Sequence, residues 1–282
     1  MWKGMEDVKQ TAKASSLRMV KIEDVRRETP MVKTFLFRDR FCRAAKPGQF
    51  VMIWLPGVDE VPMSLSLIDS SGLSGVTVKN VGEATTALHG KVAGDVIGVR
   101  GPFGNGFKPA AGRIVLVGGG TGVASLLSLA ESLKGRASSM VFLVGFKSKR
   151  ELFLIDRLKE LSSGGKCNLV VATEDGSYGE KGLVTDFLDA LLARERFSMV
   201  YTCGPELMMR KVFDIAETRR IPVQACLERI IKCGVGLCGS CVIGCYRVCG
   251  EGLVLSSEQL REVKDEFGAF KRDFDGRRIP FK

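Results

Sequence analysis

Cysteine is the residue type in this chain whose spacing most clearly indicates chemistry. Six of the nine cysteines in the 282-residue sequence lie between Cys226 and Cys249. Three of them, Cys233, Cys238 and Cys241, follow the spacing C-x4-C-x2-C, which is typical of three of the four thiolate ligands of a plant-type [2Fe–2S] cluster. The glycines between them allow backbone N–H groups to turn toward sulfur. We therefore predict a [2Fe–2S] site in this segment.

The fourth ligand must come from Cys226, Cys245 or Cys249. Cys245 lies only four residues after Cys241, so the chain would have to turn back tightly for both to bind one cluster. Cys249 lies eight residues after Cys241, which leaves room for a small hairpin, so Cys249 is the predicted ligand. A structural zinc site fits less well, because such sites usually repeat C-x2–4-C twice. A cluster of buried thiols is the third interpretation, and Cys226 and Cys245 are most simply small apolar side chains.

A glycine-rich turn is the second candidate site. Gly118, Gly119, Gly120, Thr121 and Gly122 follow an apolar run and open a helical pattern, so the backbone there can approach a pyrophosphate closely. The turn is not a complete Rossmann fingerprint, since Val123 replaces the third glycine and no acid ends the second strand. That strand is followed instead by basic residues, namely Lys147, Lys149 and Arg150.

Two further loops are predicted to reach the same edge, because loops after parallel strands emerge at their carboxyl ends. They are residues 173–179, which include Asp175, and residues 202–206, which include Cys203, Gly204 and Pro205. A ligand is expected there. Ordinary turn chemistry is an equally good interpretation of Asp175 and its neighbour Ser177.

A third candidate site lies nearer the N-terminus. The stretch from Gly82 to Thr86 resembles a loop entering a short helix over Thr85–Lys91, and such a start offers free N–H groups to a phosphate. Lys79 lies just upstream with a compensating charge. From the residues alone, Val61–Ser66 is interpreted as a polar, turn-like interruption.

The elements that must position these residues fall into two patterns. Short alternating or β-branched runs with Gly and Pro between them predict an all-β sandwich or small barrel: residues 17–25, 32–37, 49–55, 76–81 and 96–99. From Arg113, continuous apolar runs alternate with helical patterns, which predicts a doubly wound parallel sheet. The runs are residues 113–117, 140–145, 168–173 and 199–203, and the helices are residues 124–133, 151–161, 183–192 and 205–218, with a further amphipathic candidate at 257–267.

Composition limits the function classes. The net charge is +10, and residues 1–43 hold eleven Lys and Arg against six Asp and Glu. The basic residues form no block, so nucleic-acid binding is not expected. No apolar run is long enough for a membrane span, and the N-terminus lacks a signal peptide, so a cytoplasmic location is expected. The single histidine, His89, argues against His-based catalysis or metal sites.

The combination of motifs resembles the ferredoxin–NADP reductase superfamily. Within it, the chain is most similar to the electron-transfer subunits of type B dihydroorotate dehydrogenase, over roughly residues 17–255. The specific parts are Gly118–Gly122, the stretch Glu174–Gly179 with Lys181-Gly182, the Cys-Gly-Pro at residues 203–205, and the cysteine motif.

The resemblance implies FAD in the barrel, NAD(H) in the α/β domain and one [2Fe–2S] cluster. By position, it implies an isoalloxazine border (Val61, Pro62, Met63, Ser64), a ribityl–pyrophosphate stretch (Val78, Lys79, Asn80) and a pyrophosphate loop (Gly82, Ala84, Thr85). Cys203 would face the nicotinamide as the catalytic residue. The chain departs from the family at Val61, where an Arg is usual, and at Met63, where an aromatic is frequent. Lys79 is the expected replacement charge.

The expected protein is therefore an α/β plus all-β oxidoreductase subunit. Its predicted parts are a flexible N-terminus (1–16), an FAD-binding β-barrel (17–110), an NAD-binding doubly wound domain (111–222), a small [2Fe–2S] domain (223–255) and a C-terminal tail (256–282). Such a subunit would exchange electrons between NAD and a separate FMN-containing catalytic subunit in pyrimidine biosynthesis, as a heterotetramer. The alternatives are a reductase subunit of a hydrogenase, sulfide dehydrogenase or transhydrogenase-type complex, and an iron–sulfur or zinc module without flavin. NAD(H) is preferred over NADP(H), although the basic residues at 147–150 could bind a 2′-phosphate.

Overall fold

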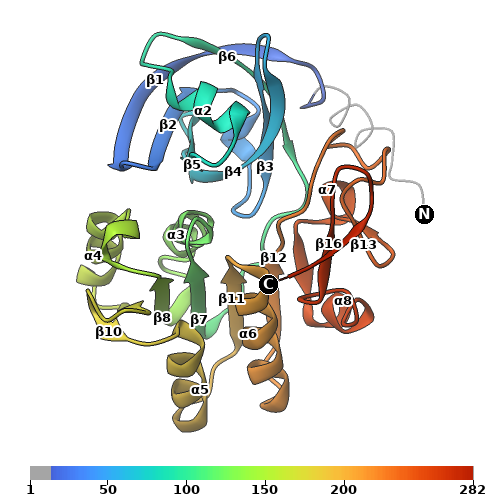
Figure 1. The fold of residues 1–282 in the computed structure, drawn as a ribbon. Helices are drawn as coiled ribbons and strands as arrows, with labels where there is room; N and C mark the ends of the chain where they lie inside the picture. The colour runs from blue at the N-terminus through green and yellow to red at the C-terminus, as the bar shows by residue number, and fades with distance from the viewer. Residues whose placement is uncertain (1–13, 282) are drawn as a thin grey trace.

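The computed structural model describes residues 14–281 and contains an N-terminal barrel, an α/β layer structure and a C-terminal segment beside both (Figure 1). Most of the N-terminus that the sequence predicts to be flexible, residues 1–13, lies outside the described residues. None of the helices among the described residues is long and apolar enough to cross a membrane. The predicted combination of a β-barrel with a doubly wound α/β sheet is confirmed.

The barrel is closed and antiparallel, with the strand order β1-β2-β5-β4-β3-β6. Its last strand returns to pair with its first. Side chains that alternate along the strands fill its interior, among them Phe35, Phe37, Val51 and Ile53. The strands are β1 (Arg18–Thr29), β2 (Val32–Arg38), β3 (Phe50–Leu55), β4 (Asp59–Ile68), β5 (Leu73–Lys79) and β6 (Val96–Phe103), and the barrel also carries η1 (Cys42–Ala44) and α2 (Glu83–His89).

The turn interpreted at Val61–Ser66 is wrong, because these residues lie within the ten-residue strand β4. Up to Ser64 the strand pairs with β3 on one side, and it pairs with β5 on the other side only from Leu65 onward. Pro62 therefore lies where one edge of β4 is unpaired, which is where a strand tolerates a residue without an N–H. The Pro and Ser residues of this stretch suggested a turn, but pairing with neighbouring barrel strands holds it as a strand.

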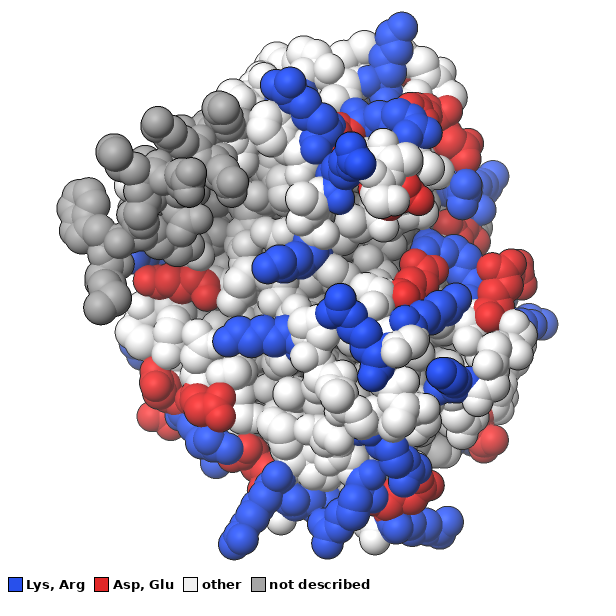
Figure 2. Space-filling view, turned by 180° about the vertical axis from the view of Figure 1, so that it is seen from behind, with Lys and Arg blue, Asp and Glu red and all other residues white. Residues whose placement is uncertain are grey.

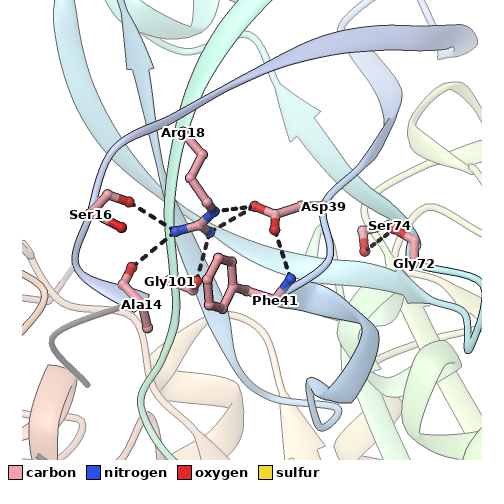
Figure 3. A network of polar contacts seen from close by, with 8 residues as sticks. All are labelled: Ala14, Ser16, Arg18, Asp39, Phe41, Gly72, Ser74 and Gly101. Carbon is pink, nitrogen blue, oxygen red and sulfur yellow. Dashed lines mark hydrogen bonds and ion pairs between the residues drawn. The ribbon is translucent and has the colours of Figure 1, made fainter. Parts of the chain in front are cut away.

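The start of the barrel is held by one arginine (Figure 3). Arg18 donates from Nε to Asp39 Oδ2 over 2.7 Å and from Nη2 to the carbonyl of Gly101 over 2.8 Å. Its guanidinium also lies 4.5 Å from the ring centroid of Phe41. These contacts tie β1 to the chain just after the middle of β6.

The α/β part is built on a seven-stranded sheet with the strand order β10-β9-β8-β7-β11-β12-β15. All neighbours are parallel except the last pair, β12 and β15. The strands are β7 (Gly112–Gly119), β8 (Ala137–Phe146), β9 (Cys167–Thr173), β10 (Glu180–Lys181), β11 (Met199–Cys203), β12 (Val223–Cys226) and β15 (Val254–Ser256). The two strands β12 and β15 flank the cysteine-rich segment, so that segment begins and ends within this sheet.

Helices cover both faces of the sheet. Helix α3 (Gly122–Ser132) lies between β7 and the barrel strand β4, with α4 (Ile155–Ser163) beside it (Figure 1). Helices α5 (Val184–Arg194) and α6 (Glu206–Thr218) lie on the opposite face. The predicted helix over 151–161 begins later than expected, because residues 149–151 form the 3₁₀ turn η2 (Lys149–Glu151) and Leu154 has a left-handed φ of 57°.

The C-terminal part packs against the sheet rather than extending away from it. It contains a small hairpin of β13 (Val242–Ile243) and β14 (Tyr246–Arg247), then α7 (Val248–Glu251), α8 (Ser257–Glu262), β16 (Phe270–Arg272) and β17 (Arg278–Pro280). The predicted helix over 257–267 is shorter than expected and ends at Glu262. Phe267 is fully buried, 6.2 Å from the ring of Phe213 on α6, so the turns after α8 serve to bury this ring.

Charged side chains are mixed on the surface. Figure 2 shows Lys and Arg spread over one face of the molecule with Asp and Glu among them, rather than gathered in one block. Many of the ion pairs join different elements, such as Arg38 with Glu23 and Lys211 with Asp186. The excess of positive charge is therefore distributed.

Candidate functional site

Two connected cavities lie where the carboxyl ends of the sheet strands meet the barrel. The barrel-side cavity, about 380 Å³, lies between the β4 and β5 strands, the start of α3 and the residues that follow β12. The sheet-edge cavity, about 600 Å³, lies over the ends of β7, β8 and β11. Lys79, Thr121 and Glu228 line both cavities. Both volumes are in the range of small-molecule and cofactor sites.

Most residues that the sequence singled out line one of these cavities. The barrel-side cavity is lined by Pro62, Met63, Ser64, Val78, Lys79, Thr85, Thr121, Gly122 and Cys203. The sheet-edge cavity is lined by Lys79, Gly119, Gly120, Thr121, Gly204 and Pro205. Residues from the barrel and from the sheet, some of them as distant in sequence as Pro62 and Cys203, are thus brought to one place.

Six singled-out residues lie beside the cavities rather than on their walls. Val61 pairs with Ile53 and packs on the barrel core, and Gly118 lies under α3 against Val123. Ala84 is buried on α2. Asp175 is exposed, and hydrogen bonds from Ser177 lower the pKa of its carboxyl. The other two are Asn80 and Gly82.

The loop from Asn80 to Thr86 is closed by its own side chains. The N–H groups of Val81 and Gly82 both donate to Thr85 Oγ1 over 2.9 Å, and Thr86 Oγ1 donates to Asn80 Oδ1 over 2.7 Å. The Thr85 hydroxyl donates to the carbonyl of Gly82. The two N–H groups just before the helix are therefore engaged by the loop itself.

Lys79 is the basic group at the junction of the two cavities. Its Nζ lies 3.8 Å from Glu151 Oε1, and both side chains are partly exposed. An exposed ion pair of this length contributes little to stability. Lys79 can therefore exchange this partner for a phosphate oxygen at little cost.

The glycine-rich loop is shaped by close packing of backbone against backbone. A Cβ on Gly122 would lie 2.3 Å from the carbonyl oxygen of Cys203, and a Cβ on Gly204 would lie 2.7 Å from that of Gly119. A Cβ on Gly119 would meet Met208 Sδ at 2.7 Å. The ends of β7 and β11 can approach each other only because these positions lack side chains, which leaves room above them for a ligand.

Cys203 ends β11 in register with Cys226 at the end of β12. Both thiols are almost fully buried and both line the barrel-side cavity. A hydrogen bond with Cys226, together with burial, raises the pKa of the Cys203 thiol well above its usual range. The thiol is neutral near pH 7, so it offers a polarisable, uncharged surface to the cavity.

Glu228 is a functional candidate that the sequence analysis did not identify. It lines both cavities. Its side chain is exposed toward these cavities, although many protein atoms lie around the carboxyl group. Burial raises the pKa of this carboxyl, and the charge of Glu206 raises it further. Glu206 itself is held in a buried ion pair with Arg229. The position of Glu228 after a sheet strand was the available signal, but β12 was not predicted as a strand.

The cysteine-rich loop gathers four thiols in two pairs. Cys233 neighbours Cys238, and Cys241 neighbours Cys249, with a hydrogen bond between the thiols in each pair. Backbone N–H groups also point at the sulfur atoms: Gly236 N lies 3.1 Å from Cys249 Sγ and Leu237 N lies 3.4 Å from Cys233 Sγ. Gly234, Gly236 and Gly239 all have φ between 74° and 78°, the left-handed region that turns these N–H groups inward.

The environment of this loop favours the thiolate form of Cys233 and Cys241. Burial opposes the charge of Cys233 more than any other single effect, but N–H groups of the loop together lower its pKa to about 6. The Cys249 thiol donates to the Cys241 sulfur, which lowers the pKa of Cys241 to about 7 and raises the pKa of Cys249. Metal ligation requires thiolates, so the loop is prepared for iron or another thiophilic metal.

Cys245 and Cys226 lie apart from these pairs. Cys245 is exposed in the two-residue turn of the β13–β14 hairpin, which is the hairpin that the eight-residue spacing between Cys241 and Cys249 allows. Cys226 is buried against Cys203. Among residues 14–281, no three His, Cys, Asp or Glu side chains converge closely enough to hold a single metal ion.

Comparison with known proteins agrees with the architecture. Residues 116–214 match the family model of the oxidoreductase NAD-binding domain. The solved structure of an NADH-dependent reduced ferredoxin–NADP oxidoreductase, described in work on flavin-based electron bifurcation, superimposes with a TM-score of 0.77 at 29% identity, over 89% of this chain and 93% of that chain.

Curated relatives are similar over nearly the full length. A protein of Methanocaldococcus jannaschii is 40% identical over 92% of this chain and 96% of its own length. One from Methanothermobacter thermautotrophicus is 42% identical over 93% of this chain and 97% of its own length. Both bear the name "Probable dihydroorotate dehydrogenase B (NAD(+)), electron transfer subunit". The chain therefore belongs to the family of dihydroorotate dehydrogenase B electron-transfer subunits.

Proposed function

We propose that this chain carries electrons between NAD and the catalytic subunit through FAD in the barrel-side cavity and a [2Fe–2S] cluster in the cysteine-rich loop. One observation carries the proposal: the cysteine-rich loop packs directly on the wall of the barrel-side cavity. Phe50 lines that cavity and lies 5.7 Å from the ring of Phe103, and a Cβ on Gly234 would meet Phe103 at 3.2 Å. Two aromatic rings thus lie between the cavity and the loop.

FAD is proposed to occupy the barrel-side cavity and its approach. Pro62, Met63 and Ser64 on β4, with Val61 behind them, would border the isoalloxazine. Val78, Lys79 and Asn80 would follow the ribityl–pyrophosphate stretch, with Lys79 as the charge for phosphate. Gly82, Ala84 and Thr85 would shape the pyrophosphate end. When bound, FAD accepts or donates two electrons as a hydride on one side and single electrons on the other.

NAD(H) is proposed to bind over the sheet edge. Gly118, Gly119, Gly120, Thr121 and Gly122 would receive the pyrophosphate, while Asp175, Gly204 and Pro205 would complete the loops around it. Cys203 would face the nicotinamide with its neutral thiol. The name of the relatives supports NAD over NADP. Glu151 and Glu174 line the sheet-edge cavity together with Lys147. The negative charges of the two glutamates would oppose the binding of a 2′-phosphate.

The cluster is proposed to be held by Cys233, Cys238, Cys241 and Cys249. Two pairs of thiols suit two irons with two thiolates each, and the N–H groups that point at sulfur suit a negatively charged cluster. Cys238 and Leu237, which is 83% exposed, form the tip of this loop. This tip would face the catalytic subunit.

We also propose the boundaries of the parts: an FAD-binding barrel at 17–110, an NAD-binding domain at 111–222, a cluster segment at 223–255 and a tail at 256–282. The barrel strands end at Phe103 and the sheet strands begin at Gly112, which supports the first boundary. A cytoplasmic location is proposed because cluster thiolates require a reducing compartment.

The test uses the purified chain alone and with its catalytic subunit. Alone, it should show flavin and iron–sulfur absorption and reduce artificial acceptors with NADH, without oxidising dihydroorotate. Addition of the catalytic subunit should supply dihydroorotate oxidation coupled to NAD. Absence of flavin or iron–sulfur absorption would refute the cofactor assignment. Failure of coupling with the matching subunit would favour a reductase role in another complex, such as one like the NADH-dependent reduced ferredoxin–NADP oxidoreductase, whose structure is 29% identical in sequence to this chain.

A further inference from the structure

The first cysteine of the cluster motif is attached to the barrel by an arginine outside the motif. Arg100 on β6 donates from both terminal nitrogens to the carbonyl of Cys233, over 3.3 and 3.4 Å. The next residue, Gly234, packs closely on the barrel, because a Cβ there would lie 3.2 Å from Phe103 on β6 and 3.3 Å from Met52 on β3. The peptide between Cys233 and Gly234 therefore lies directly on the barrel wall.

Arg100 is held in this orientation by a forked ion pair. Its Nε donates to Glu60 Oε1 over 2.7 Å and its Nη2 donates to Glu60 Oε2 over 2.6 Å. The two side chains are only 18% and 24% exposed, so solvent screens the pair incompletely. The strand carrying Arg100 is itself held, because Arg18 donates to the carbonyl of the adjacent Gly101 (Figure 3).

The charges of this pair are close to the cysteine loop. The guanidinium of Arg100 contacts the carbonyl of Cys233, and the carboxylate of Glu60 contacts the same guanidinium. Any group bound to Cys233 is therefore within reach of two opposite charges that come from the barrel. Reduction of a cluster by one electron adds one negative charge, so the energy of that step depends on the balance of these two charges.

We propose that Arg100 and Glu60 form a positioning pair that attaches the Cys233 end of the cluster loop to the flavin barrel and sets the reduction potential of the cluster. The proposal rests on the proposed function, because it assumes the cluster. It adds a role for two barrel residues that belong to none of the proposed cofactor contacts. The Arg100 guanidinium both holds the loop at the carbonyl of Cys233 and places a positive charge, paired with Glu60, beside the proposed cluster.

The test is an EPR redox titration of the cluster in the complex of this chain with its catalytic subunit. Arg100→Gln leaves Glu60 unpaired and should lower the potential, whereas Glu60→Gln leaves Arg100 unpaired and should raise it. Each change should be on the order of tenfold in the equilibrium constant for one-electron reduction, which is about 59 mV. The double variant should return toward the wild-type value, and Arg100→Lys should stay near it.

A matched control is the partly buried pair of Arg157 and Glu131 on α4 and α3, in which Arg157 Nη2 contacts both carboxylate oxygens over 2.7 and 2.9 Å. Arg157→Gln and Glu131→Gln should leave the cluster potential unchanged. Shifts of the same sign for Arg100→Gln and Glu60→Gln, or no shift, would overturn the proposal and leave the proposed function standing. If Arg100→Gln does not retain its cluster, the sign of the Glu60→Gln shift decides. A wild-type complex without a cluster signal would overturn both.

Discussion

Two glycine-rich loops of this molecule use glycine for different physical reasons. In the loop over residues 118–122, Gly122 has no room for a Cβ, which would lie 2.3 Å from a backbone oxygen of β11. In the loop over residues 233–241, Gly239 has only one side-chain atom near such a Cβ, at 4.0 Å, but its φ is 74°. Glycine is needed at residue 122 because protein elements touch there, and at residue 239 because of the backbone conformation.

The loop over residues 118–122 is therefore held by packing on the protein core, whereas we expect the loop over residues 233–241 to be held by its ligand. The loop over residues 118–122 joins the buried strand β7 to the buried helix α3 and packs on the end of β11, so its conformation follows from packing. The cysteine loop contains little regular structure between Cys226 and β13, and its internal contacts are largely N–H groups and thiols directed at one another. We expect the first to be preformed and the second to depend on iron.

The largest effect is expected for the proposed fourth ligand. Cys249→Ser should abolish the EPR signal of the reduced cluster, because it removes one of the four thiolates. Cys245→Ser is the matched control and should keep the signal, since Cys245 is exposed in a hairpin turn. Loss of the signal in Cys245→Ser with retention in Cys249→Ser would reverse the assignment.

The next largest effect is expected in the loop over residues 118–122. Gly122→Ala should lower the free energy of unfolding by at least about 3 kcal/mol, because the new Cβ meets backbone atoms of Cys203 and Gly204 that cannot move aside. Urea titration followed by circular dichroism measures this. Gly164→Ala is the control: Gly164 has a φ of −73° and open space, so the change should be within about 1 kcal/mol. Equal effects at both sites would contradict the packing argument.

Removal of iron should distinguish the loops without mutation. After chelation under reducing conditions, amide hydrogen exchange should accelerate over residues 233–249, because the thiolates then repel one another and the positive-φ turns lose their support. Exchange at the start of α3 should stay slow. Acceleration of the same size in both loops would show that they form one cooperative unit.

The smallest effect is expected at Gly239. Gly239→Ala should cost about 1 kcal/mol from the left-handed backbone alone, because the space around the position is open. The readout is the fraction of protein that retains cluster absorption during urea titration. A loss comparable to that of Gly122→Ala would indicate a steric contact that the open space does not predict.

Local patterns were sufficient for a large part of the fold. Period-two apolar residues in the first third and continuous apolar runs between helical patterns in the second predicted the barrel and the doubly wound sheet, because burial on one or two faces leaves these marks in sequence. The order of the parts and the family followed from motifs with specific spacing. The sequence by itself also indicated the cysteine segment, since C-x4-C-x2-C is readable without a structure.

Tertiary structure alone decided which distant residues meet. Val61–Ser66 lies in a strand because the barrel supplies β3 as a partner up to Ser64 and β5 from Leu65 onward, which local Pro and Ser content does not reveal. Glu228 was missed because its importance comes from lying at the junction of two cavities, and Thr85 is engaged by its own loop rather than left free. The contact of Arg100 with Cys233 joins residues 133 positions apart. Spacing along the chain records contacts within a turn or an element, whereas contacts between elements depend on how the chain packs.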